Sequence, residues 1–193
     1  MAETATQRET QTQFVSIEEY LSFEMTSPAK HEYVNGQLFA MVGVSRRHAR
    51  IVLNIGSRLL AAAGDGSCEV YTNDVKLMVA STTVYYPDVI VACDEDDSDA
   101  YIVRQPCLVV EVLSPSTSGT DRREKLLAYR RIESLSEYLI VDQERRWIER
   151  HWRDDSRTWW HAEYLNAAVP VICLGMTLAL DDIYRSIALP QGE

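Results

Sequence analysis

The chain has 193 residues, of which 46% are apolar and 25% charged, and its formal net charge is −10. These values fit one soluble domain with a substantial core and exclude the disordered and membrane classes of protein. The negative charge argues against tight nonspecific binding to nucleic acid, because a polyanion is repelled. It does not exclude a nuclease, since carboxylates bind Mg²⁺ and the basic segment 45–50 can contact phosphate locally.

The sequence contains no apolar stretch of the roughly 18 residues that a membrane-spanning helix needs. The N-terminal segment 1–13 is polar and has no apolar signal core. We therefore expect a cytoplasmic protein that makes no contact with a membrane.

The four cysteines are far apart in the sequence and include no CxxC pair: Cys68, Cys93, Cys107 and Cys173. Such spacing favours neither a zinc knuckle nor a dense disulfide framework. We expect reduced, mostly buried thiols.

In chain order, the first predicted element is a short helix that begins near Ser16, which forms a capping-box pattern with Glu19. Asn35-Gly36 predicts a tight hairpin between strands at 31–34 and 37–41. Ser45 can cap a longer helix that Gly64 ends. The apolar residues of that helix recur at helical spacing: Ile51, Val52, Ile55, Leu59 and Leu60.

The rest of the chain predicts mainly strands. Three β-rich runs, at 68–79, 84–92 and 107–113, are expected to be adjacent in a sheet, with the acidic segment 94–99 as a solvated hairpin tip. A helix is predicted from about 121 to 132, with Leu126, Leu127 and Tyr129 among its packing residues. Further strands are predicted at 137–142, 147–152, 158–165 and 169–174, followed by a short element near 178–184.

This order of elements predicts an α/β (α+β) fold. We expect a central mixed β-sheet flanked by helices, with an additional C-terminal β region. A single domain should span 14–188, with tails at 1–13 and 189–193.

Two carboxylates stand in apolar β runs. Glu111 lies in the middle of CLVVEVL, and Asp88 follows Pro87, which cannot donate a ladder hydrogen bond and so suggests an edge, a bulge or an opening of the strand. An unpaired buried carboxylate is costly, so each needs a partner. Two carboxylates on neighbouring strands can share Mg²⁺, whereas the alternative is a structural ion pair of Glu111 with Lys76 or Lys125.

These residues resemble the pattern of restriction-endonuclease-like nucleases: a Pro-Asp pair, then an acidic residue, one intervening residue and a lysine on the next strand. Pro87-Asp88 and Glu111 match, but Leu113 occupies the expected lysine position. The chain is more closely similar to the Uma2 family of restriction-endonuclease-like proteins. In that family the glutamate strand runs into a Ser-Pro-Ser-Thr loop, here 114–117, and the lysine sits on the following helix.

The resemblance extends over about residues 16–185 and implies a set of site residues. Asp88 and Glu111 would be metal ligands, the backbone carbonyl of Val112 would add a third, and Lys125 would orient or activate water. Glu32 would help to hold the metal or its water. Further matches to the family are His48, which we leave outside the catalytic set, Asp121, Tyr129 and Glu137-Tyr138.

The function implied is a Mg²⁺- or Mn²⁺-dependent endonuclease that hydrolyses phosphodiester bonds of DNA. Leu113 and the acidic charge motivate an alternative, an inactive nuclease-fold binding or regulatory module. A third possibility is an oligomeric structural protein, since the tryptophans of the C-terminal strands could close a core or a two-fold interface. We expect a homodimer, which is compatible with a nuclease.

Overall fold

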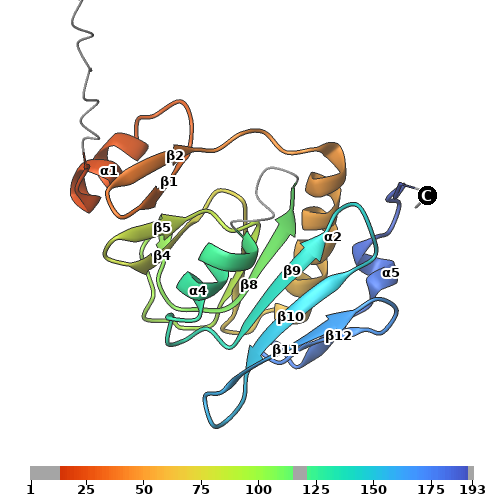
Figure 1. Cartoon of the computed structure of the whole chain (residues 1–193). Coiled ribbons are helices and arrows are strands. Elements are labelled where there is room, and N and C mark those ends of the chain that lie inside the picture. Colours follow the sequence, from red (N-terminus) through yellow and green to blue (C-terminus); the bar gives the residue numbers. More distant parts are fainter. Residues whose placement is uncertain (1–13, 115–120, 191–193) are drawn as a thin grey trace, which may run out of the picture.

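The computed structural model describes residues 14–114 and 121–190, so the expected tail at 1–13 and the end of the expected tail at 189–193 lie outside the described residues. Within the described parts, no helix is long and apolar enough to cross a membrane. Figure 1 shows the strands of the sheets with helices packed against them, which confirms the mixed α+β architecture.

The N-terminal elements form as their local sequence predicts. Helix α1 (Ile17–Glu24) begins at Ser16, whose side chain and that of Glu19 complete a capping box. Strands β1 (His31–Val34) and β2 (Gln37–Ala40) are antiparallel, and both turn residues, Asn35 and Gly36, have positive φ angles.

Helix α2 (Arg46–Ala63) begins at Ser45, whose hydroxyl accepts the backbone N–H of His48, and ends at Gly64. Four of its five predicted packing residues are buried. Leu60 is exposed, a difference from the prediction. The buried face of the helix therefore includes the other four apolar residues but not Leu60.

The central sheet has six strands in the order β11-β10-β9-β8-β6-β3. It consists of β3 (Glu69–Thr72), β6 (Val89–Ala92), β8 (Pro106–Leu113), β9 (Glu137–Asp142), β10 (Ile148–Arg153) and β11 (Trp159–Tyr164). Strands β8 and β9 are parallel and the other pairs are antiparallel, so the sheet is mixed as predicted.

A second sheet has five strands in the order β2-β1-β5-β4-β7. Its remaining strands are β4 (Lys76–Ala80), β5 (Thr83–Tyr85) and β7 (Ile102–Val103). The runs 68–79 and 84–92 were each predicted as one strand, but each is broken and contributes one strand to each sheet. The acidic segment 94–99 accordingly leads from β6 to β7 and is not the tip of a simple β6–β8 hairpin.

The remaining elements are short. A π-helical segment (Asp121–Lys125) and α4 (Leu126–Tyr129) precede β9, and β12 (Val169–Val171), β13 (Met176–Leu178) and α5 (Leu180–Ile183) follow β11. The predicted helix at 121–132 is thus shorter and partly π-helical. Tyr129 is fully buried, as predicted, whereas Leu127 is exposed.

The six-stranded sheet has a hydrophobic core on each face. Alternate residues of β8, such as Val110 and Val112, pack with Ile51 and Ile55 of α2. Residues of the other face, including Val109, pack with α4 and with the five-stranded sheet. Strand β8 is therefore covered on both sides, which explains its nearly continuous apolar sequence.

The cysteines differ from the prediction. Cys68 is bonded to Cys93 and Cys107 to Cys173, and all four side chains are only partly buried. The prediction of reduced, buried thiols was wrong because pairing of β3, β6 and β8 brings together cysteines that are distant in the sequence.

The tryptophans of the C-terminal strands are mainly packing residues. Trp147 is buried, and its indole N–H donates to Glu163 Oε2 at 3.0 Å. Guanidinium groups lie over two other rings, Arg150 over Trp152 and Arg153 over Trp159. Trp160 is 52% exposed, and its indole N–H donates to Asp154 Oδ2 at 2.7 Å.

His151 on β10 is a buried histidine whose protonation makes the stability of the fold depend on pH. Burial, followed by the nearby Arg130 cation and His161, lowers the pKa of His151 from 6.5 to about 4. The Arg130 guanidinium lies 3.2 Å from Nδ1, which fits a neutral ring that accepts this hydrogen bond. The folded protein therefore resists protonation of this side chain.

We expect the free energy of unfolding to fall by on the order of 2 kcal/mol as the pH drops from about 6.5 to about 4, because only the unfolded chain then protonates His151. Above the unfolded pKa this contribution is fully present. Urea unfolding at several pH values measures the slope, and His151→Phe should flatten it. Equal slopes for both proteins would contradict the prediction.

Candidate functional site

Asp88 lies where the chain passes from one sheet to the other. Strand β5 ends at Tyr85 and β6 begins at Val89, so Pro87 and Asp88 occupy the break between them. The last β6–β8 pair here is Val89 with Val110, so the ladder stops just before Asp88. Pro87 explains the break, since it has no N–H for a ladder hydrogen bond.

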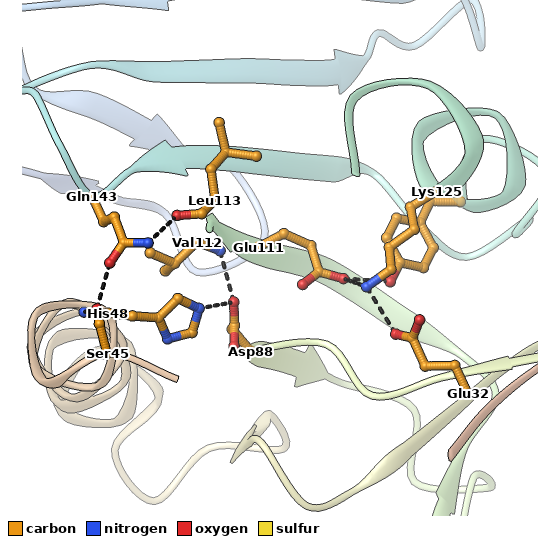
Figure 2. Close-up of polar contacts among 10 residues, drawn as sticks. Glu32, Ser45, His48, Asp88, Glu111, Val112, Leu113, Lys125 and Gln143 are labelled. Carbon is orange, nitrogen blue, oxygen red and sulfur yellow. Dashed lines mark hydrogen bonds and ion pairs between the residues drawn. The ribbon is translucent and has the colours of Figure 1, made fainter. Parts of the chain in front are cut away.

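The Asp88 side chain is held by the end of β8 and by α2. Its Oδ2 accepts the backbone N–H of Val112 at 2.7 Å and lies 3.1 Å from His48 Nε2 (Figure 2). The second oxygen, Oδ1, has no hydrogen bond or ion pair with the described residues. One carboxylate oxygen is thus fixed, and the other remains available for a ligand.

Glu111 is buried in β8, with 4% of its surface exposed. Its Oε1 accepts the Tyr129 hydroxyl at 2.7 Å and lies 3.1 Å from Lys125 Nζ. Because β8 is covered on both faces, this carboxylate depends on the cation and the phenol for compensation. The predicted need for a partner is confirmed, and of the two lysines considered, Lys125 contacts it.

Lys125 lies between two acidic side chains. Its Nζ is 2.9 Å from Glu32 Oε1 and 3.1 Å from Glu111 Oε1, and only 5% of the residue is exposed. Figure 2 shows Glu111 pointing toward Lys125, with Glu32 reaching the same ammonium group from β1. The lysine ammonium group at this site thus comes from the helical segment Asp121–Lys125, since the strand position expected for a lysine is Leu113.

Two tyrosines lie next to the Glu111–Lys125 pair, Tyr129 bonded to Glu111 and Tyr85 in contact with Lys125. Burial, with the adjacent Glu111 charge, raises the pKa of Tyr129 well above its usual value. Burial, with the nearby Glu32 charge, also raises the pKa of Tyr85 to about 12. Lys125 Nζ lies 5.3 Å from the centre of the Tyr85 ring, within the range of a cation–π contact. Both phenols therefore stay protonated at neutral pH.

Gln143 connects the end of β8 to the start of α2. Its side-chain N–H donates to the Leu113 carbonyl at 2.8 Å, and its Oε1 accepts the Ser45 hydroxyl at 2.5 Å. Gln143 is buried, so these bonds are shielded from water. The sequence analysis missed this residue, which no motif marks, because its role depends on tertiary contacts.

The structure brings all predicted site residues to one end of β8: Glu32, Asp88, Glu111, Val112 and Lys125. It also places His48 beside Asp88, although we had left His48 outside the catalytic set. Its buried Nδ1 has no hydrogen-bond partner among the described residues. The side chain of Asp121 and the loop 115–120 lie outside the described residues.

The fold and the arrangement of these side chains define a restriction-endonuclease-like protein. The fold is similar to the crystal structure of "a putative nuclease belonging to DUF820" from Anabaena variabilis, with a TM-score of 0.72 and 16% identity. That similarity covers 88% of this chain and 97% of the other. The chain belongs to the Uma2 family, described as "putative restriction endonuclease", whose model matches residues 17–181.

Two curated relatives come from Synechocystis sp. The chain is 36% identical over 177 residues to the uncharacterized protein slr1290, which covers 90% of this chain and 93% of that protein. It is 34% identical over 152 residues to the uncharacterized protein sll1609, which covers 77% of this chain and 86% of that protein. The two similarities therefore extend over 90% and 77% of this chain.

Proposed function

We propose that this protein is a cytoplasmic Mg²⁺- or Mn²⁺-dependent endonuclease that hydrolyses phosphodiester bonds of DNA. The observation that carries the proposal is the convergence of Asp88, Glu111 and Lys125 at the end of β8, although they come from three separate segments. Membership of the Uma2 family supports the nuclease class.

The oxygen atoms at this site suit a hard divalent cation. Mg²⁺ is commonly held by one or two carboxylates, with water and substrate phosphate completing its shell. Asp88 and Glu111 would supply the carboxylates and Val112 its backbone carbonyl. Asp88 Oδ1 has no partner among the described residues, as a side chain that serves as a ligand requires. A bound metal would polarise the scissile phosphate and lower the pKa of a water ligand.

The surrounding side chains have distinct roles in this proposal. His48 and the Val112 N–H fix one oxygen of Asp88 and leave the other for a metal ligand bond. Glu32 and Glu111 hold Lys125 in place, where its ammonium group can orient a water molecule or bind a phosphate oxygen. Tyr129 donates to Glu111 and fixes the orientation of that carboxylate.

The DNA backbone would meet local positive charge despite the net charge of −10. Arg46 and Arg50 are exposed on the first turns of α2, two positions before and after His48 in the sequence. The N-terminus of a helix also carries partial positive charge, which favours phosphate.

We further propose that the protein acts as a homodimer, with the exposed Trp160 as a contact. Light scattering tests this assembly.

The proposal is tested by incubating the chain with plasmid DNA in Mg²⁺, in Mn²⁺ and in a chelator. We expect nicking or linearisation only with metal, and none by Asp88→Asn, which keeps the side-chain shape but removes the charge. Calorimetry should show saturable metal binding by the wild type that Asp88→Asn loses. Metal binding without cleavage would instead favour a non-catalytic binding module, and cleavage unchanged in Asp88→Asn would exclude this site.

A further inference from the structure

Four cysteine sulfur atoms gather at the end of the central sheet opposite the nuclease-like site. Cys68 precedes β3, Cys93 follows β6, Cys107 is the second residue of β8 and Cys173 follows β12. Glu111 lies four residues farther along β8 than Cys107, a distance of about 14 Å in an extended strand. The cysteine cluster is therefore separate from the site of Asp88 and Glu111.

The strand pairing explains why the sulfur atoms meet. Glu69 pairs with Ala92, so Cys68 and Cys93 face each other one position farther along the two strands. Ala92 pairs with Pro106 across a bulge, which brings Cys107 beside Cys93. Pairing within the sheet thus places Cys68, Cys93 and Cys107 together, and Cys173 reaches Cys93 from the turn that follows β12.

Three of the four sulfur atoms lie within reach of one metal ion, and the fourth, Cys68 Sγ, is bonded to Cys93 Sγ. Besides its bond to Cys68, Cys93 Sγ lies 3.3 Å from Cys107 Sγ and 3.8 Å from Cys173 Sγ. The Sγ atoms of Cys93, Cys107 and Cys173 all lie within 4.8 Å of one another. Thiolates bound tetrahedrally to zinc at about 2.3 Å are about 3.8 Å apart.

The backbone of two of these cysteines is bonded to Ser136 and Glu137, at the start of β9. The Cys107 carbonyl accepts both the backbone N–H and the hydroxyl of Ser136, at 3.0 and 2.9 Å. The Cys173 N–H donates to the buried Glu137 carboxylate at 3.0 Å. Ligands on such fixed backbone lose little freedom when they bind an ion.

We infer that the reduced chain binds one Zn²⁺ through the four cysteines, as a structural site that fastens the β12 segment to the central sheet. Four thiolates are a common structural zinc set, and soft sulfur ligands select zinc over magnesium. Binding releases the four thiol protons and changes no oxidation state. In the structure described here the same sulfur atoms form two disulfides, so reduction of these bonds is needed to supply the thiol ligands.

The full chain, reduced with a phosphine and then freed of reductant, tests the site. The phosphine takes up oxygen from water to become its oxide, and each disulfide gains two electrons and two protons. We expect one zinc per chain by mass spectrometry of metal content. Substitution with Co²⁺ should give the thiolate charge-transfer and tetrahedral ligand-field bands of a sulfur-coordinated ion. Zinc should also slow the reaction of the thiols with a disulfide reagent by at least about tenfold.

Matched variants separate this site from the nuclease-like site. Cys93→Ser with Cys107→Ser should bind no zinc, whereas Asp88→Asn should retain one zinc per chain and the same cobalt spectrum. The wild-type measurement alone decides the matter if the double variant fails to fold. The inference would be overturned if the reduced, folded wild type binds no zinc and its four thiols react equally fast with and without the ion. The cysteines would then serve only to form disulfides.

Discussion

Glu111→Gln is expected to abolish Mg²⁺ binding and to lower the rate of DNA cleavage by roughly a thousandfold or more, since a metal contributes several kcal/mol to the transition state. The amide keeps the volume of the carboxylate but removes the charge that attracts the ion. Calorimetric titration measures the binding, and plasmid cleavage measures the rate.

The fold of Glu111→Gln should persist, because Lys125 keeps its contact with Glu32 and Tyr129 can still donate to the amide oxygen. We expect the free energy of unfolding to fall by only about 1–3 kcal/mol, the usual cost of weakening a buried polar contact. Circular dichroism and urea unfolding serve as controls. Metal binding at wild-type affinity would show that Glu111 is merely the structural partner of Lys125.

Lys125→Met is the counterpart of Glu111→Gln, and it separates the binding of the metal from the cleavage of DNA. The variant keeps Asp88 and Glu111, so Mg²⁺ should still bind, and removal of the ammonium group makes the site more negative. If Lys125 orients water or phosphate, cleavage should nevertheless fall by about a hundredfold, as is typical when a positioned proton-transfer or polar group is lost. Wild-type cleavage by this variant would leave Lys125 with a structural role alone.

Glu137→Ala is expected to lower the free energy of unfolding by about 3–5 kcal/mol, a large share of the total stability of an ordinary domain. Glu137 is fully buried, and its Oε1 accepts two hydrogen bonds from Arg150, at 3.0 and 2.7 Å. The variant would leave a buried guanidinium without its carboxylate. It would also remove the acceptor of the Cys173 N–H. Urea unfolding at neutral pH measures the loss.

The double variant Glu137→Leu with Arg150→Met provides the control for this prediction. It removes both charges together and fills the space with apolar atoms, so much of the stability should return. If the double variant is as unstable as Glu137→Ala, the cost arises from packing or from the Cys173 amide, and the ion pair is not its source. Comparison of the double variant with the single variants Glu137→Leu and Arg150→Met gives the coupling energy of the pair.

The order of elements could largely be predicted from local signals. The capping box at Ser16, the Asn35-Gly36 turn and the cap at Ser45 act within a few residues, so the sequence pattern is sufficient to place them. The broken strands were not predictable in the same way. Both halves of the run 84–92 have strand-forming sequence. Pro87 marks the interruption between them, but only packing decides that the two halves belong to different sheets.

The sequence by itself determined which residues require an explanation. A carboxylate inside an apolar strand needs a partner wherever the strand lies, so Glu111 and Asp88 could be singled out without coordinates. The resemblance carried by the glutamate, the Ser-Pro loop and Lys125 indicated the family, and the family match confirms it.

Only the tertiary structure decided which groups meet. Glu32 and Lys125 are 93 positions apart in the numbering, yet the fold places Lys125 Nζ 2.9 Å from Glu32 Oε1. The contacts of His48 with Asp88, of Gln143 with Leu113 and among the four cysteines arise in the same way. Such contacts depend on strand order and sheet pairing, which are set by burial over the whole chain, whereas turns and caps depend on neighbouring residues alone.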